Sequence, residues 1–557
     1  DTVSKADGGT FDGNVTMAGT LAVTGATTLT GGVSGNTTFS NNVTITGDLA
    51  SSTSGTSNFR AGVNAGNSIA SGGNFNTVVG DEAGTALTTG DDNTAFGYGA
   101  LYSEDAHGKN TAVGTNSLLT LNAGADGYNT AVGYFSGRLI TTGIRNTLIG
   151  SSSGVSLTSG NYNTALGYIA LDADTQGQSS VAIGYGSLTS QNFTSATDAY
   201  NVAVGLNAGN QVTTGISNTI VGGLAGDALT DADHNVAVGQ SALSADTKGS
   251  KNTAVGHSAL EAQNFTSSTS SYNTAIGSDA GKAISTGIQN VIIGSNAGDA
   301  LTDADFNVAI GYNVLSADTK GSRSVAIGRS ALGSQNFSSA TDTNNTAVGF
   351  GTGSSVTTGT SNTLIGNSAG DTIQSGNNNI CLGSGSDVNH DTSNGIAIGV
   401  NISATDNDFS FGKASNVVTN DFDTDANFSR SSDERLKKNI TNQTLGLDFI
   451  NDLRTVKYNW KPSHELDSTD SQLAHLYKEK EADNEMNTTA TMHNFIAQEV
   501  KAALDKAGVS DFSGWKEDQY GVQQVSREMF IIPLVKAMQE LSAKNDALEA
   551  RIKTLEG

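Results

Sequence analysis

Residues 201–205 read NVAVG, and residues 218–222, which lie 17 positions later, read NTIVG. The pattern Asn-x-φ-φ-Gly, in which φ is an apolar residue, returns from Asn76 to Asn379, with Ser in place of Asn at positions 180 and 324. A last, degenerate copy, GIAIG, begins at Gly395. Internal repetition is the strongest guide to architecture that a sequence offers, and here it covers most of the chain.

The spacing of the copies indicates a stack of similar coils. Most steps are 17 positions long, one is 19 and three are 21, and the order 17, 17, 17, 21 makes equivalent copies begin at Asn163, Asn235 and Asn307, which is a 72-residue period. Each unit has one short β-branched stretch and too few apolar residues to bury a core alone. Such units are stable when they stack. We predict a β-solenoid or β-roll over residues 61–405, with two short strands per turn, the second in the Ala/Ser-rich half, such as YFSGRL at 134–139.

The N-terminal region follows a looser pattern. Residues 10–49 alternate apolar and polar positions between glycines, which predicts short strands. The apolar residues are Val15, Met17, Leu21, Val23, Leu29, Val43, Ile45 and Leu49. One ribbon of this kind is too thin to fold alone, so residues 1–60 are interpreted as a fibrous β-stalk or attachment segment of three chains. We expect, more widely, that one copy buries too little of itself and that the chain forms a homotrimer.

The composition changes sharply after a connector, which we place at residues 406–431. Both prolines and both tryptophans lie beyond it, whereas 63 of the 68 glycines lie before residue 431. The stretch 431–557 carries 16 of the 29 Lys and Arg side chains. Two kinds of protein are joined here, and residues 432–557 are predicted to form a small α+β domain.

Several classes of partner and cofactor are not expected. The net charge of −25 argues against nucleic acid, because phosphate contacts need clustered Lys or Arg. The chain has no run of about 18 apolar residues, so we expect no membrane insertion. The histidines show no ligand spacing, and the acidic loops 227–235 and 299–307 lack the Gly and Glu of a dedicated Ca²⁺ loop. We therefore expect no metal and no cofactor, and we expect Cys381, in an apolar position, to be buried.

Four motifs after the connector carry a family resemblance. They are SDERLKKNI from Ser432, VKYNWKP at 456–462, HNFIAQEV at 493–500 and the terminal MFIIPLVKAMQELSAKNDALEARIKTLEG at 529–557. In this order they resemble the intramolecular chaperone auto-processing domain, a self-cleaving serine peptidase, at the C-terminus of phage tail fibres and spikes. The repeats are similar to viral tail fibres and to the β-roll heads of trimeric adhesins. The resemblance implies a domain that trimerises, helps the repeats to fold and then cuts itself off.

The resemblance also implies residue roles. The cut bond joins Ser431 to Ser432, with Ser432 as the nucleophile, Lys437 as its base and Asp433 as an orienting carboxylate. A hydroxyl needs an adjacent base to attack, and lysine can serve where burial lowers its pKa. Ser432 attacks its own backbone, so effective molarity is high. One turnover per chain is expected. The alternative is that SSDERLKK is only an N-cap followed by a charged helix start.

The terminal helix carries apolar residues at heptad spacing, which predicts a trimeric coiled coil. The core positions are Met538, Leu541, Asn545, Leu548, Ile552 and Leu555. The alternative is a helix that packs on its own domain.

Three phenylalanines recur with the same 72-residue period, in the long steps: Phe193, Phe265 and Phe337. An exposed aromatic ladder beside Asn and Gln would suit a sugar receptor. The alternative, which we favour, is that each ring packs over the roll and staples its loop, or packs between subunits.

These features together predict a homotrimeric viral tail fibre or spike on the virion, which contacts other tail proteins and a glycan or protein on the host surface. A bacterial surface adhesin of similar build and a glycan-depolymerising tailspike are the alternatives. An adhesin of the autotransporter type would end in a membrane β-barrel, and a depolymerase needs a carboxylate pair in a groove.

Overall fold

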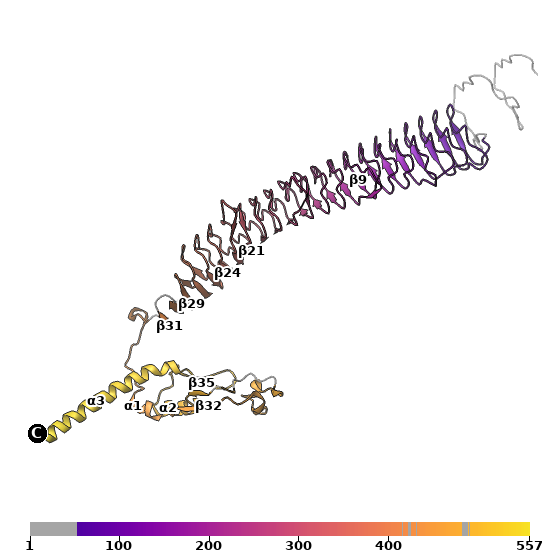
Figure 1. Cartoon of the computed structure of the whole chain (residues 1–557). Helices are drawn as coiled ribbons and strands as arrows, with labels where there is room; N and C mark the ends of the chain where they lie inside the picture. Colours follow the sequence, from indigo (N-terminus) through magenta and orange to yellow (C-terminus); the bar gives the residue numbers. More distant parts are fainter. Residues whose placement is uncertain (1–52, 415, 422–424, 431, 482–487, 490) are drawn as a thin grey trace, which may run out of the picture. The chain divides into compact units, whose positions relative to one another are not determined.

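The computed structural model describes residues 53–414, 416–421, 425–430, 432–481, 488–489 and 491–557 (Figure 1). The chain divides into two compact units, Asp1–Ser431 and Ser432–Gly557, and each is treated by itself. The alternating residues 10–49, on which the predicted stalk rests, lie outside the described residues.

One short strand from each repeat contributes to a single sheet, which has 23 strands in the described part of the first unit. In the order in which they pair, the strands are β1 (Phe59–Ala61), β2 (Thr77–Val79), β3 (Thr94–Phe96), β4 (Thr111–Val113), β5 (Thr130–Val132), β6 (Thr147–Ile149), β7 (Thr164–Leu166), β9 (Val181–Ile183), β11 (Val202–Val204), β12 (Thr219–Val221), β13 (Val236–Val238), β15 (Thr253–Val255), β17 (Thr274–Ile276), β18 (Val291–Ile293), β19 (Val308–Ile310), β21 (Val325–Ile327), β23 (Thr346–Val348), β24 (Thr363–Ile365), β25 (Ile380–Leu382), β27 (Ile396–Val400), β29 (Asp408–Lys413), β30 (Asn416–Asp421) and β31 (Asp425–Arg430).

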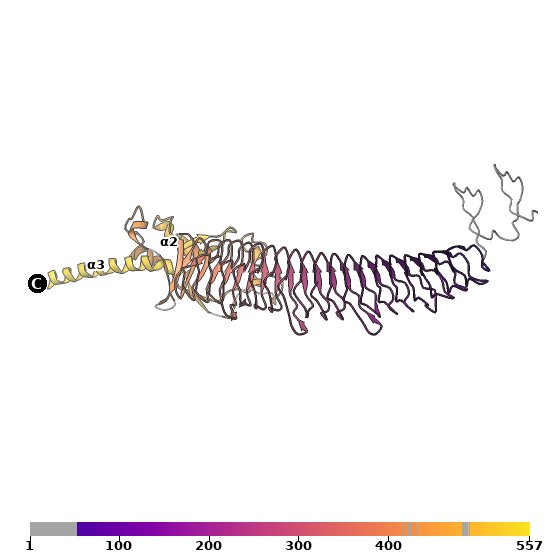
Figure 2. The ribbon, with the colours of Figure 1, turned by 90° about the horizontal axis from the view of Figure 1, so that it is seen from above.

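Neighbouring strands pair in parallel and in register, so that equivalent residues of successive repeats lie side by side. The predicted β-solenoid is confirmed, and Figure 2 shows its coils stacked one on another. The last two pairings, β29 with β30 and β30 with β31, are antiparallel. These three strands lie in the stretch that we expected to be a connector.

The core of the solenoid closes within one chain. We number each coil from the first residue of its repeat, which is position 0. Position +2, the middle of the strand, points inward and is fully buried, as in Ala203, Ile220 and Ala237. The expectation that one copy buries too little of itself is therefore wrong for the solenoid, because each coil is covered by the coils on either side. Cys381, also at position +2, is fully buried as expected.

The second half of a 17-residue coil forms turns, so the prediction of a second strand in every coil is wrong. Residues with a positive φ recur at alternate positions of this half, for example Asn207 at 52° and Gly209 at 58°, and a backbone of this kind is not extended. Among the described coils, short second strands occur where a 17-residue coil pairs with the 21-residue coil that follows it, and again near the end of the solenoid. The pairs are β8 (Gly177–Gln178) with β10 (Thr197–Asp198), β14 (Gly249–Ser250) with β16 (Thr269–Ser270), β20 (Gly321–Ser322) with β22 (Thr341–Asp342), and β26 (Asp387–Val388) with β28 (Ser403–Ala404).

A ladder of buried asparagines at position 0 locks each coil to the next. The amide oxygen Oδ1 of Asn218 accepts the backbone N–H of Asn235 at 3.0 Å, and Asn218 donates its own N–H to Oδ1 of Asn201 at 2.9 Å. The Asn218 Nδ2 group donates to the carbonyl of Ala232, at position +14 of its own coil, at 2.8 Å. One side chain thus satisfies backbone groups in two coils, which explains why the repeat begins with Asn.

The glycine at position +4 is required by close stacking. Gly97 has a φ of +132°, and a Cβ there would lie 2.7 Å from the carbonyl oxygen of Gly114 in the next coil. No L side chain fits this conformation at this spacing. The Gly that ends the repeat is therefore a steric requirement of the stack.

The 72-residue period has a packing explanation. At position +11, where Val212 and Leu229 point into the core, the next two coils place Asp246 and Gln263. The same two coils carry Leu243 and Leu260 at position +8, where Gly209 and Gly226 stand in the others. A leucine thus fills at +8 the volume that is lost at +11, and the core stays dense.

The second unit is a small α+β domain, as predicted. Its elements are η1 (Glu434–Leu436), α1 (Leu447–Asp452), β32 (Val456–Tyr458), η2 (Ser463–Glu465), η3 (Ala474–Leu476), β33 (Met492–Asn494), α2 (Ala497–Lys506), β34 (Trp515–Glu517), β35 (Gln523–Val525), η5 (Arg527–Phe530) and α3 (Ile531–Glu556). Its core contains Phe449, Val500, Leu504 and Phe530. No helix among the described residues combines the length and apolarity needed to cross a membrane.

The asparagine ladder gives a direct test. Asn218→Ala leaves the N–H of Asn235 and the carbonyl of Ala232 buried without these partners, which should cost about 2–4 kcal/mol of local stability. Hydrogen exchange of the Asn235 amide measures this loss. Asn122→Ala, at an exposed asparagine, is the control. Equal protection in the two variants would contradict the account.

Candidate functional site

Ser432 and Lys437 are in contact. The Nζ group of Lys437 donates a hydrogen bond to Oγ of Ser432 at 2.7 Å. Between them lies the single turn η1, which begins because the carboxylate of Asp433 caps it by accepting the backbone N–H of Arg435 at 2.9 Å. This turn brings a lysine five positions along the chain back to the serine. A nucleophile and a base within hydrogen-bond distance are the minimum that serine attack requires.

Asp433 has a different partner from the one we expected. Its Oδ2 accepts a hydrogen bond from the guanidinium of Arg435 at 2.6 Å, and this interaction lowers the pKa of the carboxyl. This N-cap is what the alternative interpretation of SSDERLKK predicts, but the helix that it starts ends after one 3₁₀ turn. Asp433 therefore stabilises the turn. Its hydrogen bonds go to Arg435 and not to Lys437, so they do not support the expected orienting role.

The Ser432–Lys437 pair lies at the junction of the two units and is open to solvent. The boundary between the units falls between Ser431 and Ser432, the bond that the resemblance marks for cleavage. Ser431 itself lies outside the described residues. Ser432 and Lys437 are both exposed, and lysine gives up its proton more readily when it is buried. The second unit alone does not provide that burial.

The recurring phenylalanines are buried. Phe193, Phe265 and Phe337 are 6%, 8% and 8% exposed. The backbone N–H of Phe193 donates to Oδ1 of Asp174 at 3.2 Å. The exposed aromatic ladder is therefore wrong, and the rings cover the roll as in the alternative that we favoured.

The heptad residues of α3 are uncovered within the chain. Met538, Leu541, Leu548, Ile552 and Leu555 are between 49% and 83% exposed. Only the first part of the helix packs on its own domain, where Pro533 and Ala537 are buried and Glu540 accepts the N–H of Leu447 at 2.7 Å. Asn545, at a core position, donates to Glu549 at 3.1 Å. The stripe is free for another helix to cover.

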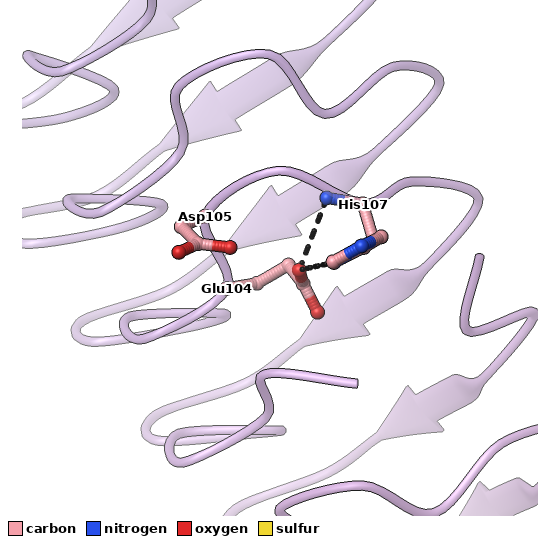
Figure 3. Close-up of side chains that lie close together, drawn as sticks. All are labelled: Glu104, Asp105 and His107. Atoms are coloured by element: carbon pink, nitrogen blue, oxygen red, sulfur yellow. Dashed lines mark hydrogen bonds and ion pairs between the residues drawn. The ribbon is translucent and has the colours of Figure 1, made fainter. Parts of the chain in front are cut away.

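One cluster of possible metal ligands occurs among the described residues, and sequence reasoning missed it. Glu104, Asp105 and His107 place their ligand atoms within 4.8 Å of one another (Figure 3). The signal was present as Glu-Asp-x-His, but its short spacing fits no common metal motif.

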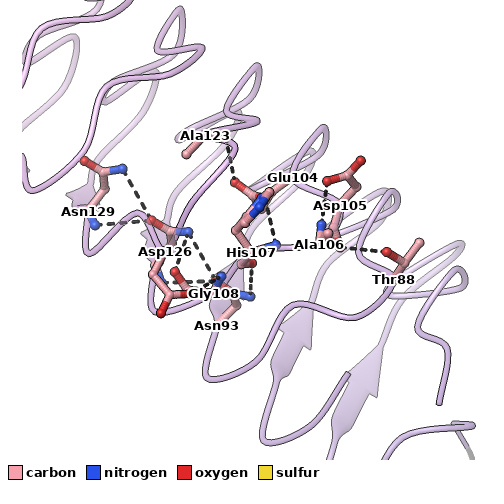
Figure 4. Close-up of polar contacts among 11 residues, drawn as sticks. Thr88, Asn93, Glu104, Asp105, Ala106, His107, Gly108, Ala123, Asp126 and Asn129 are labelled. Atoms are coloured by element: carbon pink, nitrogen blue, oxygen red, sulfur yellow. Dashed lines mark hydrogen bonds and ion pairs between the residues drawn. The ribbon is translucent and has the colours of Figure 1, made fainter. Parts of the chain in front are cut away.

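The contacts of Glu104 give it a structural role. Its carboxylate accepts the N–H of His107 at 3.2 Å and, from the next coil, the N–H of Ala123 at 3.4 Å (Figure 4). The imidazole Nδ1 of His107 lies 3.3 Å from the same carboxylate. Burial raises the pKa of Glu104. These contacts hold the coil that precedes the 19-residue step.

Buried aspartates hold the backbone in the same way in the coil before each 21-residue step. Asp174 accepts the N–H groups of Gly177 and Phe193 and the side-chain amide of Gln191, and Gln191 accepts from Asn201. Asp246 and Asp318 repeat this arrangement. Burial raises the pKa of Asp174 and of Asp246. These carboxylates accept hydrogen bonds inside the coil, which gives them a structural role.

Asp371 and Asp387 form a carboxyl pair near the end of the solenoid. The pKa of Asp387 is raised to about 6, first by burial and also by the neighbouring Asp371, while hydrogen bonds from Thr372 and Val388 oppose the rise. The two side chains hydrogen-bond to each other. Glycosidases hold their two carboxyl groups roughly 5–9.5 Å apart, so this pair does not fit glycan hydrolysis.

The geometry defines a class before any comparison: a parallel β-solenoid followed by a small α+β domain that begins with a serine–lysine pair. Residues 432–509 match a family model described as the chaperone of endosialidase. This match confirms the resemblance of the C-terminal domain to the chaperone domain of phage tail fibres and tailspikes. No curated protein and no solved structure shows a significant match to the chain.

The carboxyl pair predicts a pH dependence. The pKa of Asp387 is about 6 in the folded state, above the ordinary value of 3.8, so the folded state holds the proton more tightly. Its contribution to stability is present below about pH 4 and is lost as the pH rises through about 6. Hydrogen exchange of the Val388 amide, corrected for intrinsic rates, should show weaker protection at pH 8 than at pH 5. Asp387→Asn should remove the difference, and an unchanged difference would contradict the assignment.

Proposed function

We propose that this chain is a homotrimeric phage tail fibre or spike protein that attaches the virion to the host surface, and that its C-terminal unit aligns the chains and then cuts itself off. The observation that carries the proposal is the hydrogen bond between Lys437 and Ser432 at the start of the chaperone domain. It lies at the first bond of the second unit, where cleavage would separate the two units without breaking a coil.

The cleavage uses one serine, one lysine and one water molecule. Lys437, in its neutral form, takes the hydroxyl proton of Ser432 while Oγ attacks the carbonyl carbon of Ser431. The bond between that carbon and the nitrogen of Ser432 breaks, an ester to Oγ forms, and the freed amine takes the proton from Lys437. Water then hydrolyses the ester and leaves a carboxylate at Ser431.

The exposed position of the pair supports a link between cleavage and assembly. A lysine that must lose its proton needs cover, and in a single chain both residues face solvent. Packing of a second copy against this junction would supply the cover. Cleavage would then follow assembly and would not occur in chains that are still separate.

The uncovered stripe on α3 supports trimerisation. Apolar residues with this spacing and exposure are typical of a helix that packs on copies of itself. Aligning three long solenoids in register costs much conformational entropy and has no local nucleus. The compact C-terminal unit would supply that nucleus at one end of the solenoids. Its removal by cleavage would then trap the assembled fibre kinetically.

Self-cleavage has a simple test. Wild-type protein should yield a fragment that ends at Ser431, and Ser432→Ala should stay full length, because it lacks the attacking oxygen. Lys437→Met should slow the cut by at least about 100-fold, the usual contribution of a positioned base. Intact mass measured over time gives both results.

The matched control is Lys438→Met, which removes the same charge one position further on. It should cleave at the wild-type rate. A wild-type chain that assembles fully but is never cleaved would contradict the self-cleavage proposal.

The helix stripe has its own test. Leu548→Asp in the uncleaved Ser432→Ala background should weaken self-association at least tenfold, because burying a leucine contributes about 1.5–3 kcal/mol and 1.4 kcal/mol is tenfold. Native mass spectrometry over a dilution series measures this. Ala550→Asp, on the outer face of the same helix, should have no effect. Equal weakening by both variants would argue against a coiled coil.

A further inference from the structure

Four coils carry a buried carboxylate at position +11, and three of the four are built alike. In these three coils the carboxylate accepts backbone N–H groups and also a glutamine amide from position +11 of the next coil. The pairs are Asp174 with Gln191, Asp246 with Gln263 and Asp318 with Gln335, at 2.5–2.6 Å. The fourth carboxylate, Glu104, has no such partner, because the next coil places Leu121 at position +11.

Glu104 is therefore a buried carboxylate with little compensation. Its side chain is fully buried. It accepts the backbone N–H groups of His107 and Ala123 at 3.2 and 3.4 Å, and among the described residues it receives no side-chain amide. Burying a carboxylate is costly unless it is paired with an opposite charge or well hydrogen-bonded. A cation beside Glu104 would supply the compensation that a glutamine supplies in the other three coils.

The residues that follow the carboxylate also differ in this coil. Each of the three aspartates is followed by Thr at the next position and by Gly two positions after that. A Cβ at Gly177 would lie 2.1 Å from Oδ2 of Asp174, so no side chain fits there. Around Glu104 the same two positions hold Asp105 and His107. The coil that lacks the glutamine thus carries, in place of Thr and Gly, two residue types that bind metal ions.

The three side chains converge closely enough to share one ion. Figure 3 shows the carboxylate of Glu104 between Asp105 and the ring of His107, and the ligand atoms all lie within 4.8 Å of one another. Nδ1 of His107 lies 3.3 Å from Oε1 of Glu104. Zinc bonds of about 2.0–2.2 Å in a tetrahedron place the ligand atoms roughly 3.4 Å apart. Nδ1 is shielded from solvent without a hydrogen-bond partner, and Asp105 is partly exposed, so its carboxylate can turn toward the ion.

We propose that Glu104, Asp105 and His107 bind one divalent transition-metal ion, such as Zn²⁺, which compensates the buried carboxylate and fixes the coil before the 19-residue step. One imidazole beside two carboxylates favours such an ion over Ca²⁺, which takes oxygen ligands. The inference goes beyond host attachment and self-cleavage and does not depend on them. It replaces the expectation of no metal, which rested on the spacing of the histidines, because here a single histidine acts together with two carboxylates.

Zinc titration of the uncleaved Ser432→Ala chain, in competition with a chromophoric chelator, tests the site. One Zn²⁺ per chain should bind, and Ca²⁺ should not displace it. His107→Ala and Asp105→Ala, both at partly exposed positions, should each weaken binding at least about tenfold, since loss of even an outer partner of a metal ligand costs that much. The matched control is His257→Ala, which removes an imidazole that lies 4.0 Å from the single carboxylate of Asp279. It should bind Zn²⁺ as the parent chain does.

Hydrogen exchange gives a second readout at the site itself. The amide of Ala123 donates to Glu104 (Figure 4), so Zn²⁺ should slow its exchange in the parent chain and leave it unchanged in His107→Ala. Equal protection of the two proteins without zinc shows that the variant is folded. A parent chain that binds no Zn²⁺ in the competition, or equal binding by the parent and His107→Ala, would overturn the inference. So would an equal loss in His107→Ala and His257→Ala. None of these results bears on cleavage at Ser431 or on self-association.

Discussion

The structure depends on one constraint: every coil must place the same atoms above the same atoms of the coil before it. The Asn at position 0 serves this by bonding to the backbone of two coils, and the Gly at position +4 serves it by leaving room for the next carbonyl. With these two residues fixed, the strand between them needs only a small inward residue at +2 and β-branched neighbours. The Asn-x-φ-φ-Gly repeat follows from this constraint.

Variation is tolerated where the stack can compensate. The coils that carry Asp or Glu at position +11 come before the 19- and 21-residue steps, and there the carboxylate holds the backbone of the longer coil. A leucine at +8 restores the lost core volume. The buried carboxylates therefore allow the next coil to be longer. The regular 72-residue period arises because the same arrangement recurs every four coils. None of them has the arrangement that glycan cleavage requires.

The sequence predicted the solenoid and the class of the C-terminal domain, because the repeat and the four motifs are long and ordered. It did not predict the turns in the second half of each coil, because these turns place residues such as Leu188 and Leu224 at positive φ, which L side chains rarely adopt. It placed Ser432 beside Lys437 through a family resemblance, but it could not tell that Asp433 pairs with Arg435. It also overstated the need for three copies, because stacking in one chain was enough to bury position +2.

In this account, the C-terminal unit brings copies of the chain together and is then removed by cleavage. The most direct test is to unfold and refold two proteins: the cleaved fragment that ends at Ser431, and the uncleaved Ser432→Ala chain. The account predicts that both return to solenoid structure, but that only the uncleaved chain regains the original oligomer by native mass. If the cleaved fragment reassembles as fast and as completely as the uncleaved chain, the C-terminal unit is no chaperone of assembly, and the account is wrong.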